Sequence, residues 1–186
     1  MDQFVSAFTN KIDTKGRVSV PASFRTVLAK DGLDGIYCYP SLDAPALDAG
    51  GQRLVDKING LVEGLAPYSD ERDQLATALF GTSEILSIDQ DGRTILPERL
   101  REHAGITTHI TFVGLGEKFQ MWEPGRFEAN LAEARQKVRD LRKLLGAGAA
   151  EAAGQREHGN DGGSRRGFDR RRRTGPPHSR DALRSH

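Results

Sequence analysis

The residue types best suited to a chemical role lie in one short segment near the start of the chain, Lys11-Ile12-Asp13-Thr14-Lys15-Gly16-Arg17. An arginine can bond O6 and N7 of guanine in the major groove, while a lysine binds phosphate as a point charge. We therefore hypothesise that Arg17 reads bases and that Lys15, helped by Lys11, fixes the register on a nucleic-acid backbone. The alternative is that Arg17 pairs with Asp13 or a neighbouring carboxylate and only braces the turn.

This segment belongs to an internal repeat. Residues 12–25 line up without gaps on residues 88–101, and Ile-Asp, Gly-Arg, a proline and a final arginine are identical in both copies. The spacing is too wide for a solenoid of short units, so two copies of a half-domain fit better. Asp91 stands where the first copy has Lys15, which makes the second loop a poorer phosphate binder. Arg93 remains a candidate DNA contact, although its acidic neighbours favour a structural role.

Local structure must position these side chains in each copy. Alternating residues surround an Asp-x-x-Gly sequence, in which the aspartate can accept backbone N–H bonds and Gly16 or its equivalent supplies a positive φ. This pattern predicts a β-hairpin in each copy. Pro21 and Pro97 then stand where a helix would begin, at the first helical position, which needs no backbone donor. The helices are expected to be short, about eight to ten residues, and to end before Gly32 and Gly105.

Further strands are expected after these helices, at residues 36–39 in the first copy and at residues 110–113 and 119–122 in the second. The first copy shows no counterpart of the 110–113 strand, unless a shortened connection hides it. A half of roughly 45 residues buries too little apolar surface to be stable alone. The two copies should therefore share one core, and interleaved hairpins are one arrangement that achieves this. The predicted fold class is α+β and rich in β-structure, with both repeats in one domain.

Helical spacing of apolar residues marks the remaining segments. Residues 51–80 predict two helices, with Pro67 ending the first and Ser69 or Asp70 capping the second. After Pro124 a heptad seam predicts a longer helix, which packs either on this subunit or on a neighbour. The seam comprises Phe127, Leu131, Ala134, Val138, Leu141 and Leu145.

The formal net charge of +1 hides an uneven distribution. Arginine dominates the end of the chain, as in Arg165-Arg166 and residues 170–173, where little can be buried. We expect this tail to be disordered, and either merely solvated or able to add salt-sensitive DNA affinity by counterion release. The predicted organisation is a first repeat at 4–50, a helical insert at 51–80, a second repeat at 81–124, a helix at 125–146 and the tail at 147–186.

Other chemistries find little support. Cys38 is the only cysteine, so no internal disulfide can form, and its apolar surroundings favour a small buried hydrophobe over a reactive thiol. His103 and His109 lack metal-ligand spacing, and Trp122 is expected in the core or in a subunit contact. No pocket for acid–base work and no dinucleotide loop is legible, so we expect no enzyme, metal, cofactor or small-molecule substrate. With no signal peptide and no span of ~20 apolar residues, we expect a soluble, cytoplasmic protein without a membrane partner.

The whole pattern resembles the MraZ family of bacterial regulators, which is related to the AbrB-like swapped-hairpin DNA-binding proteins. The resemblance rests on residues 11–21, the second Asp-x-x-Gly-Arg copy, Ala104-Gly105-Ile106, Phe112-Val113-Gly114 and residues 120–124. It implies AbrB-like repeats that build one barrel-like unit, and homo-oligomeric rings that present several N-terminal loops to repeated boxes of double-stranded promoter DNA. It also implies action in the nucleoid, on the gene cluster for cell division and cell-wall synthesis. For Lys15, Gly16 and Arg17 it strengthens the assignment to DNA binding.

Two other functions remain open. An antitoxin module of the same superfamily would bind a toxin through its C-terminal region, although such modules typically have one hairpin repeat. A ring-forming scaffold would use the C-terminal helix and the arginine-rich tail to bind protein or RNA.

Overall fold

The structure, a computed structural model, describes residues 2–157 of the 186-residue chain. It divides into two compact units, Met1–Val138 and Arg139–His186. The first unit is a mixed α/β structure that contains all the strands of the described chain. The arginine clusters at 165–166 and 170–173 lie outside the described residues.

Each repeat supplies four strands and one helix in the same order. The first repeat comprises β1 (Ala7–Lys11), β2 (Arg17–Ser19), α1 (Ala22–Asp31), β3 (Ile36–Pro40) and β4 (Leu47–Gly50). The second comprises β5 (Glu84–Leu86), β6 (Arg93–Ile95), α4 (Glu98–Ala104), β7 (His109–Gly114) and β8 (Phe119–Trp122). The expectation that the first copy lacks a strand was wrong, because β3 corresponds to β7 and β4 to β8. Sequence reasoning missed β4 because its four residues include Asp48 and Gly50, types that are depleted in strands.

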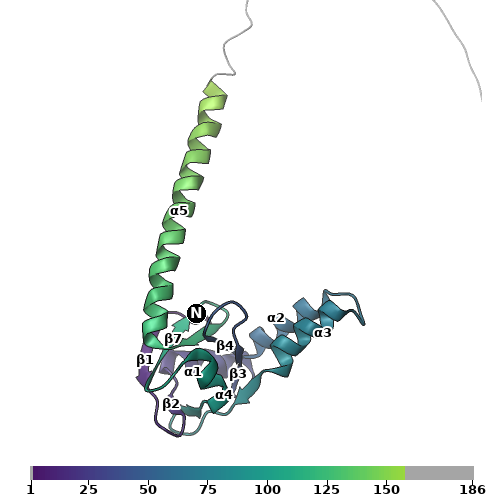
Figure 1. Cartoon of the computed structure of the whole chain (residues 1–186), viewed down its shortest axis with the longest axis vertical. Coiled ribbons are helices and arrows are strands. Elements are labelled where there is room, and N and C mark those ends of the chain that lie inside the picture. The colour runs from purple at the N-terminus through teal and green to yellow at the C-terminus, as the bar shows by residue number, and fades with distance from the viewer. Residues whose placement is uncertain (1, 158–186) are drawn as a thin grey trace, which may run out of the picture. The chain divides into compact units, whose positions relative to one another are not determined.

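The strands form two antiparallel sheets (Figure 1). Six strands follow the order β1-β7-β8-β4-β3-β5, and β2 pairs with β6 in a separate two-stranded ribbon. Strands β1 and β5 each have one neighbour in this order, so the large sheet is open at both edges. The expected barrel-like unit is therefore not a closed barrel within the described chain.

The two predicted hairpins have the right turns but the wrong strand pairing. Only one bridge, Ile12 to Val18, joins the arms of the first hairpin. Instead β1 pairs with β7, β2 with β6 and β3 with β5, so that each repeat completes the sheets of the other. This interleaving, one of the arrangements expected from the sequence, buries the apolar sides of both repeats in one core, which neither half could form alone.

Local signals set the ends of the two repeat helices. Helix α1 has ten residues and is followed by Gly32 at φ 84°, while α4 has seven and is followed by Gly105 at φ 65°. Both C-terminal glycines were predicted, because the left-handed conformation there carries no Cβ penalty. The prolines differ from expectation: Pro21 and Pro97 are extended and lie one position before the first helical residue.

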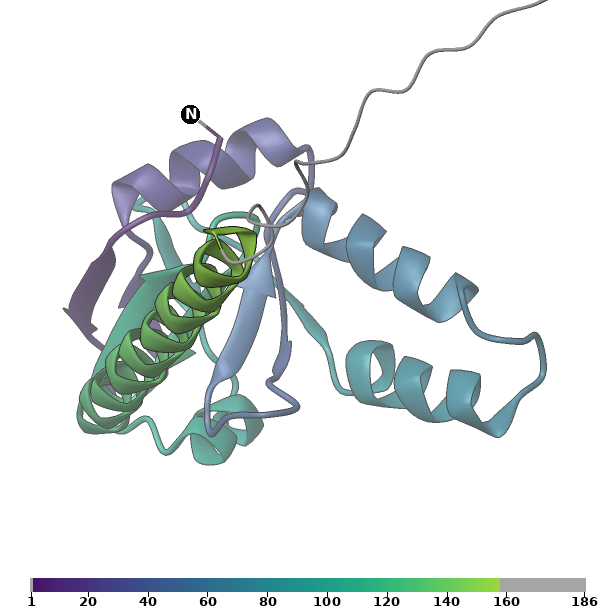
Figure 2. The ribbon, with the colours of Figure 1, turned by 90° about the horizontal axis from the view of Figure 1, so that it is seen from above.

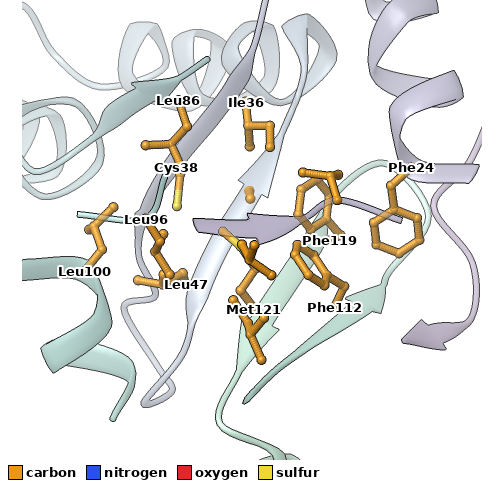
Figure 3. Packing of buried hydrophobic residues seen from close by; sticks show 14 of the residues in the cluster. Phe24, Ile36, Cys38, Leu47, Leu86, Leu96, Leu100, Phe112, Phe119 and Met121 are labelled. Atoms are coloured by element: carbon orange, nitrogen blue, oxygen red, sulfur yellow. The ribbon is translucent and has the colours of Figure 1, made fainter. Parts of the chain in front are cut away.

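The core contains side chains from both repeats (Figure 3). Phe24 of α1 packs 5.1 Å from Phe119 of β8 between ring centroids, and Leu100 of α4 is completely buried. Cys38 is also completely buried, which confirms the expectation of a small buried hydrophobe. Burial raises the pKa of the Cys38 thiol well above its ordinary value, so the thiolate is disfavoured.

The insert between the repeats is a pair of helices, α2 (Gln52–Glu63) and α3 (Asp70–Ala76), which lie side by side (Figure 2). A short π-helical turn, Thr77–Gly81, follows α3. Of the two predicted capping residues, Ser69 caps α3, because its hydroxyl accepts the N–H of Arg72 at 3.2 Å, while Asp70 is the first helical residue. Helix α2 ends before Gly64 and not at Pro67.

Helix α5 (Pro124–Glu157) is longer than the predicted span of 125–146. Residues 147–157, expected to be disordered, continue the helix, which accords with the high helix propensity of their alanines. At the start of the helix Phe127 is buried beside Trp122, so the seam begins against this chain. Further along, Leu141 and Leu145 are exposed within the described chain. None of the helices in that part of the chain is long and apolar enough to cross a membrane.

Candidate nucleic-acid interface

Residues 13–17 form a closed turn, called turn 1. One carboxylate oxygen of Asp13 accepts the backbone N–H groups of Lys15 and Arg17, each at 2.9 Å. The backbone closes the same turn through bonds from Gly16 N–H to the Asp13 carbonyl and from Asp13 N–H to the Arg17 carbonyl. The Arg17 N–H and then its guanidinium hold the pKa of Asp13 below its ordinary value of 3.8. Asp13 therefore stays ionised at neutral pH and fixes the backbone on both sides of Gly16.

Arg17 combines the two roles considered for it. Its Nε donates to the second carboxylate oxygen of Asp13 at 2.7 Å, which braces the turn. Its side chain is 43% exposed, and its two terminal nitrogens have no hydrogen-bond partner within the described residues. A guanidinium fixed at Nε can still present that outer edge to a base, so bracing and base contact are compatible.

Lys15 and Lys11 are both exposed, and within the described residues neither forms an ion pair. Lys15 lies inside turn 1, whereas Lys11 ends β1. Their ammonium groups are available to an external anion, as a phosphate contact requires.

Turn 2, residues 89–93, has the same backbone but different electrostatics. Asp89 accepts the N–H groups of Asp91 and Arg93 at 2.9 Å, and this hydrogen bonding lowers its pKa. Arg93 pairs with both carboxylates, through Nε to Asp89 at 3.3 Å and through Nη2 to Asp91 at 3.0 Å. One acid and two bases give turn 1 a net charge of +1, whereas two acids and one base give turn 2 a net charge of −1.

The β2–β6 ribbon connects the two turns. In its register Arg17 faces Ile95, Val18 faces Thr94 and Ser19 faces Arg93. Val18 and Thr94 are buried, while the other two pairs lie on the outer face. Arg17 and Arg93 therefore share this face at opposite ends of the ribbon, and both line a cleft of about 420 Å³ together with residues of β5 and β6.

The structure also identifies two arginines whose role sequence reasoning missed. Arg101 Nε donates to the carbonyl of Leu96 at 3.0 Å, while the Leu96 N–H donates to the carbonyl of Gly16 at 2.8 Å. A Cβ at Gly16 would lie 2.5 Å from the Leu96 oxygen and 3.3 Å from Arg101 Nε. Turn 1 thus rests on the second repeat.

The equivalent contacts of the other copy hold turn 2 against the first repeat. Arg25 Nε donates to the carbonyl of Val20 at 3.2 Å, and the Val20 N–H donates to the carbonyl of Gly92 at 2.9 Å. A Cβ at Gly92 would lie 2.6 Å from the Arg25 guanidinium carbon. The signal was visible in the sequence, since Arg25 and Arg101 are the final identical pair of the repeat, but the glycines that they lie against, Gly92 and Gly16, are in the opposite copy.

The fold and this site define a protein of two equivalent halves that share a ribbon and carry one basic and one acidic turn. A family model described as "MraZ protein, putative antitoxin-like" matches residues 79–143. The chain is 60% identical over 161 residues to the transcriptional regulator MraZ of Methylocella silvestris, covering 86% of this chain and 98% of that protein. Similar proteins of the same name occur in Xanthobacter autotrophicus, at 60% identity over 80% of this chain and 95% of that protein, and in Rickettsia bellii, at 44% over 78% and 97%. The chain belongs to the MraZ family.

Proposed function

We propose that this protein is a sequence-specific DNA-binding regulator of transcription. The observation that carries the proposal is turn 1: a rigid, exposed turn at the end of a two-stranded ribbon, with Lys15 unpaired and the outer edge of Arg17 open. The similarity to proteins named transcriptional regulators, over most of the chain, supports the same function. We propose no enzymatic role.

In this mechanism turn 1 enters the major groove, which is wide enough to admit a two-stranded ribbon. The guanidinium edge of Arg17 bonds guanine O6 and N7, while Gly16 allows the turn to lie directly against Leu96 and Arg101 of the second repeat. Lys15 and Lys11 bind phosphates and set the register of the protein on the duplex. Arg93 contributes less, because Asp89 and Asp91 already bind two of its three guanidinium nitrogens and the negative charge of turn 2 opposes a phosphate.

We also propose that subunits assemble into a homo-oligomeric ring that presents several copies of turn 1 to repeated promoter boxes. One turn offers few contacts, and several turns on one duplex gain affinity through effective concentration. The cross-repeat ribbon supports kinship with AbrB-like swapped hairpins. The expected target is the promoter of the protein's own division and cell-wall gene cluster, bound in the cytoplasmic nucleoid.

An interaction function is the second candidate. The matching family model carries the words "antitoxin-like", and α5 exposes Leu141, Leu144 and Leu145 within the described chain. In that case α5 and the arginine-rich tail would bind protein or RNA, and turn 1 would be dispensable.

A gel-shift titration at fixed salt distinguishes these functions. The duplex is the promoter region upstream of the protein's own gene, with scrambled duplex as competitor, and the full chain is compared with Arg17→Ala and Arg93→Ala. We expect wild type to prefer the promoter, Arg17→Ala to lose that preference and Arg93→Ala to retain most of it. Equal binding of both duplexes by wild type would contradict specific recognition. Retained preference in Arg17→Ala would contradict the site.

A further inference from the structure

We propose that Arg101 is a positioning residue for turn 1, so that the second repeat holds the DNA-reading turn of the first. The inference rests on the proposed function of turn 1 and extends it to a residue outside that turn. It assigns different work to the two copies: the first reads DNA, and the second supports the reading turn.

A short chain of bonds connects Arg101 to the reading residues. Arg101 Nε bonds the Leu96 carbonyl, and the N–H of Leu96 bonds the carbonyl of Gly16. Gly16 directly precedes Arg17, so the bond from Leu96 fixes the peptide group that joins them. The guanidinium also lies over the face of Gly16 where a side chain would otherwise be. Without Arg101, the Leu96 carbonyl loses a donor and turn 1 loses its cover.

This contact is better explained by positioning than by core packing. Arg101 is partly exposed and does not belong to the buried core. Turn 1 has its own internal bonds through Asp13, so it should form without Arg101. What Arg101 adds is attachment of the formed turn to the rest of the molecule. An arginine bonding bases needs its backbone held within a fraction of an ångström, which attachment provides.

The repeat supplies a matched control. Arg25 makes the equivalent bonds around Gly92, with Val20 in place of Leu96. It supports turn 2, whose own arginine is paired with two carboxylates. Removal of Arg25 or of Arg101 therefore costs the protein similar contacts, but only Arg101 supports the turn that reads DNA.

The experiment compares full-length wild type, Arg101→Ala, Arg101→Lys and Arg25→Ala by thermal unfolding, gel shift and amide hydrogen exchange. Both alanine variants should lose similar thermal stability. We expect Arg101→Ala to reduce the promoter preference about tenfold, Arg101→Lys to restore part of it and Arg25→Ala to leave it near wild type. In the free protein, exchange of the Leu96 amide should accelerate in Arg101→Ala and remain slow in Arg25→Ala. A direct phosphate contact by Arg101 would instead reduce the salt dependence of binding and leave this exchange unchanged.

Two results would overturn the inference while the proposed function stands. One is that Arg101→Ala keeps the wild-type preference for the promoter. The other is that Arg101→Ala and Arg25→Ala lose this preference equally. In both cases Arg17→Ala must itself lose the preference, which shows that turn 1 reads DNA. If wild type itself shows no preference, the proposed function fails. Hydrogen exchange then decides whether Arg101 holds turn 1, and unchanged protection of Leu96 in Arg101→Ala would refute it.

Discussion

The carbonyl of Gly16 accepts the backbone N–H of Leu96 at 2.8 Å, across 80 residues of sequence. Leu96 directly precedes Pro97, which in turn precedes helix α4, so the bond joins the tip of turn 1 to the start of a helix in the other repeat. Because Gly16 has φ 84° and lies against the Leu96 oxygen, this position needs glycine for two separate reasons.

Substitution of Gly16 should separate these two reasons. Gly32 has the same φ of 84° but no atom within 4 Å of its Cβ position, so Gly32→Ala measures the backbone penalty alone. We expect Gly32→Ala to lower the free energy of unfolding by about 1–2 kcal/mol. Gly16→Ala should lower the free energy of unfolding distinctly more than Gly32→Ala does, because its Cβ would overlap the Leu96 carbonyl. Urea denaturation of both variants tests this, and equal losses would show that turn 1 can move away from Leu96 freely.

A gain of function is expected in turn 2. Asp91→Lys removes one partner of Arg93 and gives turn 2 the charge pattern of turn 1. DNA affinity should rise, and the slope of log K against log salt should steepen by about one phosphate contact. Asp56→Lys on α2 makes the same charge change away from the ribbon and serves as the control. Equal steepening in both variants would mean that only net charge matters.

Substitution of Lys15 and substitution of Arg17 should change DNA binding in different ways. A phosphate contact carries no sequence information, so Lys15→Ala should weaken binding to promoter and scrambled duplex alike and reduce the salt slope by about one. Arg17→Ala should instead reduce the preference between the two duplexes. Fluorescence anisotropy across a salt series measures both quantities, with Lys57→Ala, a lysine already paired to Glu117, as the control. Loss of preference in Lys15→Ala would reverse the two assignments.

Turn 1 should loosen in acid. The pKa of Asp13 is depressed in the folded protein, so its ionised form contributes stability that is present above 3.8 and lost as the pH falls through the lower folded value. An NMR titration should show the amides of Lys15 and Arg17 shifting together with the Asp13 carboxyl, at a midpoint below 3.8. In Asp13→Asn these amides should show no such titration. A midpoint at or above 3.8 in wild type would mean that the carboxylate does not cap the turn in solution.

Local chemistry in the sequence predicts much of this fold. Proline and glycine delimit α1 and α4, Ser69 caps α3, and the mostly apolar segment 119–122 is β8. In each case the determining interactions lie within a few residues, or apolar side chains dominate the segment. Strand β4 was not predicted because its polar residue, Asp48, is buried only with the help of hydrogen bonds from Lys118 and Gln120, which are distant in the sequence.

In the candidate site, too, the local features follow from the sequence and the long-range contacts do not. The turn chemistry of Asp13 and Gly16 follows from their spacing, and so does the pairing of Arg93 with its acidic neighbours. Strand pairing and the contacts between each arginine and the glycine of the opposite turn do not, because these contacts join one repeat to the other at no fixed periodicity. Identity of Arg25 and Arg101 in the two copies signalled a shared role, but only the fold shows that each acts on the opposite turn.

The exchange of strands between repeats has a consequence for how such a chain could arise. A half-length ancestor with one repeat would lack partners for β1 and β2, and would have to obtain them from a second identical molecule. Gene fusion would turn that homodimer into one polypeptide and free the halves from having to stay identical. One copy could then retain Lys15 while its counterpart acquired Asp91, which a symmetric dimer, encoded by a single sequence, can never do.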